Sequence, residues 1–146
     1  MSLILFSIYL FLAIFNAGNM ITLQIQHYGI YSFVGRNDFK NYMQANNKAA
    51  VLPSIIPALL LLLCTILLIF TRPLFMTLNA VIFSLILNVT ALISTFTLQR
   101  KLQGEMASEG YNMEKINLLV NTNWIRTIVF FIQAILATVL VIKAVK

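Results

Sequence analysis

The chain has 146 residues, of which 60% are hydrophobic and only 10% are charged. Soluble proteins carry about 25% charged residues, so this balance excludes an ordinary soluble domain and indicates an integral membrane protein. The net charge is +6, but the basic residues fall mainly in expected loops and helix ends, where anionic lipid headgroups attract them. We therefore expect the lipid bilayer as a partner, no nucleic acid, and a single transmembrane domain over residues 1–146.

The first predicted element is a transmembrane helix over residues 2–26, which is long enough for the ~20 residues that a span needs. It lacks the basic flank of a signal peptide, so we interpret it as a retained span. A polar loop over 36–48 follows. Within it Phe39, Tyr42 and Met43 are spaced i, i+3 and i+4, which predicts a short amphipathic helix resting on the membrane surface or the rim of the bundle.

The second span is predicted over 49–71, with Pro53 and Pro57 in its first turns, where a missing N–H is tolerated. The turn at Arg72 and Pro73 is short and predicts an antiparallel neighbour over 74–98. A second polar stretch, 99–111, is predicted to be a loop.

The fourth helix is predicted to run unbroken over 113–144, a length of ~48 Å, which exceeds the ~30 Å hydrocarbon core. Its first turns must therefore protrude, which leaves about 119–144 as the span. Trp124 then falls near the headgroup level as an interfacial anchor. The expected fold is an all-α integral membrane bundle of four transmembrane helices, with a short amphipathic helix after the first.

The basic residues predict the orientation of this bundle. The loops after the first and third spans lie on one side of the membrane, and the turn at Arg72 lies on the other side with Lys143 and Lys146. Cytoplasmic loops are enriched in Lys and Arg, so we expect both termini outside, in a bacterial inner (cytoplasmic) membrane. The basic residues of the first side are Arg36, Lys40, Lys48, Arg100, Lys101 and Lys115.

The residues that carry chemistry are few. All acidic residues fall outside the predicted spans, and the chain has one cysteine, Cys64, and one histidine, His27. Proton-coupled carriers and carboxylate-bridged metal centres need carboxylates inside the membrane. We therefore expect no metal site and no cofactor. The acidic residues are Asp38, Glu105, Glu109 and Glu114.

His27 stands at the end of the first span, beside Tyr28 and Tyr31. One interpretation makes all three interfacial anchors, with apolar bodies in lipid and polar tips in water. The alternatives for His27 are a base or lone metal ligand, or a structural hydrogen bond inside the bundle.

Arg126 lies at the mouth of the fourth span, with Asn123 and Thr127 on the same helix face at i, i+3 and i+4 spacing. It either reaches lipid phosphate or points into the bundle, and the amide on its face favours the second. Since the spans lack acidic residues, its protein partners must be neutral: carbonyls at the end of a neighbouring helix, an amide such as Gln99 or Asn46, or a tyrosine hydroxyl. The remaining alternative is an anionic ligand headgroup. The candidate polar pocket is formed by His27, Asn46, Gln99, Asn123 and Arg126.

Four sequence blocks carry a family resemblance: H-Y-G-I-Y-x-F-V-G from His27, F-x-x-Y from Phe39, the proline at Pro57, and L-V-N-T-N-W-I-R-T over 119–127. The combination resembles small four-helix bacterial membrane proteins of uncharacterised function. More distantly it resembles the anthrone-oxygenase-like membrane proteins, which also end in an N-x-x-R-T helix. The resemblance covers most of the chain.

The resemblance also implies which positions matter. Members of the family that this chain resembles are expected to have a His at the position of Asn46, a Glu at that of Leu61, a His near that of Gln99 and an Arg at that of Gln133. This chain keeps the matching residues His27, Asn123 and Arg126, which implies a polar pocket without the metal or acid–base residues around it.

Two classes of function remain open. The first is a non-catalytic membrane protein, either an accessory or structural subunit of a hetero- or homo-oligomer, or a binder of a hydrophobic ligand. The second is a small membrane oxidoreductase or oxygenase-like enzyme acting on a hydrophobic substrate, which rests on the resemblance alone. The lack of carboxylates in the spans favours the first.

Overall fold

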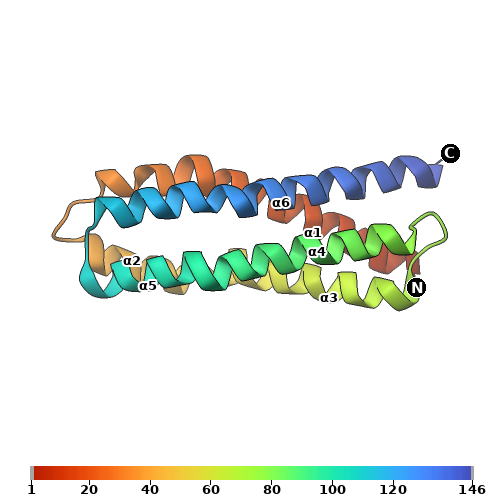
Figure 1. Cartoon of the computed structure of the whole chain (residues 1–146), viewed down its shortest axis with the longest axis horizontal. Helices are drawn as coiled ribbons and strands as arrows, with labels where there is room; N and C mark the ends of the chain where they lie inside the picture. The colour runs from red at the N-terminus through yellow and green to blue at the C-terminus, as the bar shows by residue number, and fades with distance from the viewer. Residues whose placement is uncertain (1, 146) are drawn as a thin grey trace.

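The computed structural model describes residues 2–145, and they form an all-α bundle with no strand among them (Figure 1). The helices join end to end into four long rods. Rod 1 contains α1 (Ser2–Thr22), η1 (Leu23–His27) and η2 (Tyr28–Phe33). Rod 2 contains α2 (Phe39–Ala49), η3 (Val51–Ile55) and α3 (Ile56–Thr71). Rod 3 contains α4 (Leu78–Ser94), η4 (Thr95–Gln99) and α5 (Arg100–Glu109), and rod 4 is α6 (Met113–Val145).

Local sequence determines where the rods begin and end. The Thr77 side chain accepts a hydrogen bond from the backbone N–H of Ala80 and caps α4. The Asn112 side chain does the same for the N–H of Lys115 at the start of α6. Gly110 has a φ of +95°, a conformation that L side chains rarely adopt, and it ends rod 3. Short connections between the rods make them antiparallel neighbours, and Figure 1 shows the α3–α4 turn at the same end as both termini.

Four helical stretches are long and apolar enough to cross a membrane, so the chain is a multi-pass integral membrane protein and the predicted class is confirmed. The stretches are Ser2–Phe33, Val51–Thr71, Leu78–Glu109 and Met113–Val145. Large apolar side chains cover their outer faces, as expected for helices surrounded by lipid. The fourth is one unbroken helix, as predicted.

The polar stretch at 99–111, predicted to be a loop, is mostly helical, which corrects the sequence analysis, whereas the stretch at 36–48 contains the short helix that was predicted in it. Residues 39–49 form α2 and residues 100–109 form α5, and the two helices pack against each other as extensions of rods 2 and 3. Phe39 and Met43 are fully buried, whereas Lys40 is exposed. The predicted amphipathic helix therefore exists, but its apolar face covers other helices instead of lying on a bilayer.

A separate apolar cluster holds this polar end of the bundle together. Its members come from all four rods: Tyr28, Tyr31, Phe39, Met43, Leu102, Met106, Ile116 and Leu119. In α5, Leu102 and Met106 are spaced i, i+4, which is the short helical pattern that the loop interpretation of 99–111 overlooked. The membrane half has its own larger core.

The rods bring the basic residues named above to one end of the bundle and Arg72 to the other, while Lys146 lies outside the described residues. If the basic end is cytoplasmic, a cysteine at Lys40 or Lys101 will be shielded from an impermeant thiol reagent in intact cells, and a cysteine at Arg72 will react. The labelling is done after Cys64→Ala. The reverse labelling pattern would overturn the predicted orientation.

Candidate functional site

Rods 1, 2 and 3 each change from α-helix to a π-helical turn at one level of the bundle. These turns are η1, η3 and η4, and residues from all three line the same cavity. A π turn is rare and is found frequently at functional sites, because the extra residue opens the helix and redirects side chains. Three such turns around one cavity make this level the candidate site.

Two prolines of rod 2, Pro53 and Pro57, explain part of the change from α-helix to π turn in this rod. Pro57 has no N–H to donate to the carbonyl of Pro53 one turn earlier, so that carbonyl needs another partner. The Asn19 amide of rod 1 supplies it, with Nδ2 donating to the Pro53 carbonyl at 2.9 Å and to the Ser54 hydroxyl at 3.3 Å. The contact ties rod 1 to rod 2 at the edge of the cavity.

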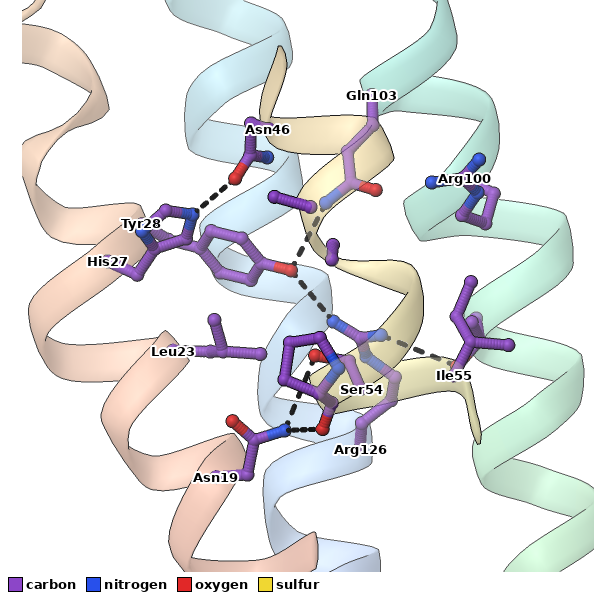
Figure 2. Close-up of a pocket in the computed structure, with 14 residues that line it drawn as sticks. Asn19, Leu23, His27, Tyr28, Asn46, Ser54, Ile55, Arg100, Gln103 and Arg126 are labelled. Carbon is purple, nitrogen blue, oxygen red and sulfur yellow. Dashed lines mark hydrogen bonds between the residues drawn. The ribbon is translucent and has the colours of Figure 1, made fainter. Parts of the chain in front are cut away.

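The cavity has a volume of about 210 Å³ and lies between rods 1 and 2 (Figure 2). Arg126 of rod 4 lies against its inner side, and Arg100 and Gln103 approach from rod 3. Its rim residues Asn19, His27 and Ser54 are only partly buried, so the cavity has an opening. The lining residues are Asn19, Leu23, His27, Tyr28, Asn46, Ala49, Ala50, Pro53, Ser54, Ile55, Thr95, Arg100, Gln103 and Arg126.

Arg126 points into the bundle, as the sequence predicted, and is only 5% exposed. Its Nε donates to Asn123 Oδ1 at 2.9 Å, and its Nη2 donates to the same oxygen and to the Tyr28 hydroxyl at 3.0 Å. Nη1 donates to Thr95 Oγ1 at 3.4 Å. The guanidinium therefore connects rods 1, 3 and 4.

All of these partners are neutral. Within residues 2–145 the ion pairs are those that Lys115 makes with Glu105 at 2.8 Å and Glu109 at 2.6 Å, near the far end of rod 4. A buried charge is costly unless it is paired, so Arg126 keeps an uncompensated positive charge at the cavity wall. Arg100 adds a second charge, and no lining residue is acidic.

Asn123 holds Arg126 in place. Its Nδ2 donates to Gln24 Oε1 at 2.7 Å, and Gln24 Nε2 donates to the Val120 carbonyl at 3.1 Å. Gln24 and Asn123 are both buried, and their two amides fix each other's orientation. Because Asn123 Oδ1 is thereby aimed at the guanidinium, the pair acts as a rigid support for the cation.

His27 belongs to a second polar group at the same cavity. Its Nε2 lies 2.8 Å from Asn46 Oδ1 and 3.2 Å from the Tyr31 hydroxyl, and Asn46 Nδ2 donates to that hydroxyl at 2.8 Å. An amide oxygen only accepts, so this arrangement requires the His27 proton on Nε2. The group links rod 1 to α2. It is the structural hydrogen bond inside the bundle that the sequence analysis gave as one alternative for His27.

The remaining predicted residues lie elsewhere. Gln99 is buried but does not line the cavity, since its Nε2 donates to Thr122 Oγ1 at 2.9 Å. Tyr28 and Tyr31 are buried in the polar end of the bundle, so their expected position as interfacial anchors is wrong. The helices α2 and α5 cover them. Trp124 is 47% exposed on the outer face of rod 4, a position open to a headgroup.

The site also contains polar residues that were not predicted as part of it, among them Asn19, Gln24, Arg100 and Gln103. Gln24 and Tyr28 are spaced i, i+4, a signal that they share a face. Gln103, whose Nε2 donates to the Tyr28 hydroxyl at 3.3 Å, lay in the stretch interpreted as a loop. Among the described residues no group of three or more His, Cys, Asp or Glu is placed to hold a metal ion.

The His27 group predicts a measurable coupling. His27→Ala and Asn46→Ala each leave the Tyr31 hydroxyl with fewer partners, so the second substitution should cost less once the first is made. In a double-mutant cycle we expect an interaction energy of about 0.5–3 kcal/mol. It is measured by chemical unfolding in one detergent, and additive effects would show that the two side chains do not act together.

The fold and the site thus define an all-α, multi-pass membrane protein with a partly open cavity that contains buried positive charge. Comparison with family models, curated proteins and solved structures gave no match for this chain.

Proposed function

We propose that this protein is a non-catalytic binder of a hydrophobic ligand, whose polar end occupies the cavity at Arg126. The observation that carries the proposal is the position of the cavity, at the level where the apolar half of the bundle gives way to its polar half. An amphiphilic molecule in the bilayer is ordered in the same way. We place the protein in a bacterial inner membrane as part of this proposal.

The lining supports a molecule with two ends. Leu23, Ala50 and Ile55 offer apolar contact, whereas Arg126, Tyr28 and Asn46 offer hydrogen bonds. Drug-sized ligands occupy pockets of about 300–1,000 Å³, so about 210 Å³ accommodates a head group and little more. The rest of the ligand would lie along the outer surface between rods 1 and 2, where apolar side chains are exposed.

A small oxygenase-like enzyme is the second candidate. The observation in its favour is His27 at the cavity wall, beside Tyr28 and Tyr31. With the proton on Nε2, the Nδ1 of His27 remains free to act as a base toward a hydrophobic phenol. This candidate predicts oxygen uptake with such a phenol, which a binder lacks.

The test compares the wild-type protein with a variant whose cavity is filled. Ala50→Phe places a ring in the lining, and Leu52→Phe makes a similar change on the exposed face of the same turn as a control. Each protein is purified gently from native membrane and analysed by native mass spectrometry. We expect a small amphiphile on the wild type and on Leu52→Phe, and its loss from Ala50→Phe.

If all three proteins retain the amphiphile equally, or if the wild type carries no small molecule, ligand binding in this cavity is contradicted. A stoichiometric partner chain in place of a small molecule would support an accessory subunit instead. Turnover of a phenol with oxygen uptake would support the enzyme.

A further inference from the structure

We propose that the head group bound in this cavity is an oxyanion, a phosphate or a carboxylate, held between Arg126 and Arg100. The inference rests on the proposed ligand-binding function and adds the charge of the ligand. It follows from the charge of the cavity, from the hydrogen-bond donors left free in it, and from its size.

The charge of the cavity is positive and has no counterion among residues 2–145. Arg126 and Arg100 both line it, and no acidic residue does. Arg126 is buried with neutral partners only, and Arg100 makes one long hydrogen bond, from Nη1 to the Asn47 carbonyl at 3.4 Å. An anion between the two would remove the cost of the uncompensated charge, which a neutral head group cannot do.

The hydrogen bonds leave several donors at the cavity without an acceptor among residues 2–145. The Tyr28 oxygen accepts from both Arg126 Nη2 and Gln103 Nε2, so its own proton needs an acceptor, and none is found among residues 2–145. The Ser54 oxygen accepts from Asn19, which leaves its proton free too. One N–H of Arg126 Nη1 also lacks a protein partner. An oxyanion accepts from such donors in several directions at once.

The size and shape of the site fit the same class of ligand. About 210 Å³ equals the liquid volume of roughly seven waters, enough for a phosphate or carboxylate and the first atoms behind it. The guanidinium of Arg100, which makes a single hydrogen bond through Nη1, offers a planar fork that matches the paired oxygens of either group, and Arg126 adds its one unused Nη1 N–H. Figure 2 shows the Arg126 guanidinium and the Tyr28 hydroxyl joined by a hydrogen bond among the residues that line the cavity, so both can contact one oxyanion.

The experiment uses pairs of probes with the same tails and different charge. Phosphatidic acid is compared with diacylglycerol, and oleate with oleyl alcohol, by the thermal shift of the delipidated full chain in neutral detergent. We expect the anionic member of at least one pair to bind about tenfold more tightly or better. Inorganic phosphate is the third arm. Its competition with the lipid would show that the free anion suffices, and its failure to compete would assign the site to a lipid headgroup.

The arginines provide the variants. Arg126→Gln and Arg100→Gln should each abolish the preference for the anionic probe, and Arg72→Gln, at the opposite end of the bundle, should keep it. Arg100 is only partly buried, so its variant remains informative if Arg126→Gln does not fold. Equal binding of charged and neutral probes would overturn the oxyanion and leave ligand binding intact. Failure of all probes to bind, together with a small-molecule-free native protein, would overturn both proposals.

Discussion

Replacing Arg126 with leucine is expected to lower the free energy of unfolding of the purified protein by about 1–3 kcal/mol. The reason is local: Asn123 Oδ1 loses the donors of Nε and Nη2, and it is buried where water cannot replace them. Arg126→Lys should recover only part of the loss. An ammonium group cannot reach Asn123, Tyr28 and Thr95 at once as the planar guanidinium does.

Chemical unfolding in one detergent measures both variants. The buried charge acts in the opposite direction to the hydrogen bonds, because removing an unpaired cation relieves its desolvation cost. The loss should therefore be smaller in fully delipidated protein than in protein that retains its native ligand. If Arg126→Leu unfolds like the wild type in both preparations, Arg126 makes no contribution to the stability of the protein.

Replacing Asn123 with aspartate is expected to weaken binding of an anionic ligand by about a hundredfold or more. The substitution keeps the size of the side chain and the oxygen that faces Arg126, but places a carboxylate beside the guanidinium. Two unit charges about 4 Å apart interact with about 4 kcal/mol at an effective dielectric constant of 20, which exceeds the difference needed. The carboxylate would then compensate the positive charge of Arg126, which is the role that we assign to the ligand.

Asn121→Asp is the matched control, since it makes the same change of charge on the exposed face of the same helix, two residues earlier. Its affinity for phosphatidic acid should stay close to that of the wild type. If Asn123→Asp also binds like the wild type, the charge of Arg126 plays no part in binding.

The sequence predicted the membrane half of the fold well, because hydrocarbon allows few alternatives. Long apolar runs located the four spans, and the unbroken pattern of α6 predicted its full length. The inward direction of Arg126 was predictable for a related reason. A cation that shares its helix face with Asn123 has a polar environment available only inside the bundle.

The polar half was predicted less well, since short amphipathic helices resemble loops until their partners are known. The polar stretch at 99–111 was interpreted as a loop, yet Leu102 and Met106 make α5 helical by packing against neighbouring helices, α2 among them. The burial of Tyr28 and Tyr31 depends on the same packing. A tyrosine near the end of a span can lie either in the lipid headgroup layer or in the interior of the bundle. The helices that cover it determine which of the two it occupies.

The π turns were not predictable either, because they depend on contacts between rods. Gln24 and Asn123 meet across 99 positions of the sequence, and no local pattern marks that pairing. The sequence shows the prolines at 53 and 57. It does not show that the Asn19 amide donates to the Pro53 carbonyl, which Pro57 leaves without its usual partner.

The turn η4 also has a consequence for how the length of this chain can vary. A π turn takes in one residue more than an α-helical turn, and one residue of helix corresponds to a rotation of about 100°. Because the π turn accommodates this extra residue, deleting a single residue from Thr95–Gln99 would restore a regular α-helix and leave the Leu102 face of α5 directed at α2. Single-residue gaps among homologous chains should therefore be tolerated in this turn with the apolar positions of α5 unchanged, whereas a gap within α4 would rotate the rest of rod 3 by about 100°.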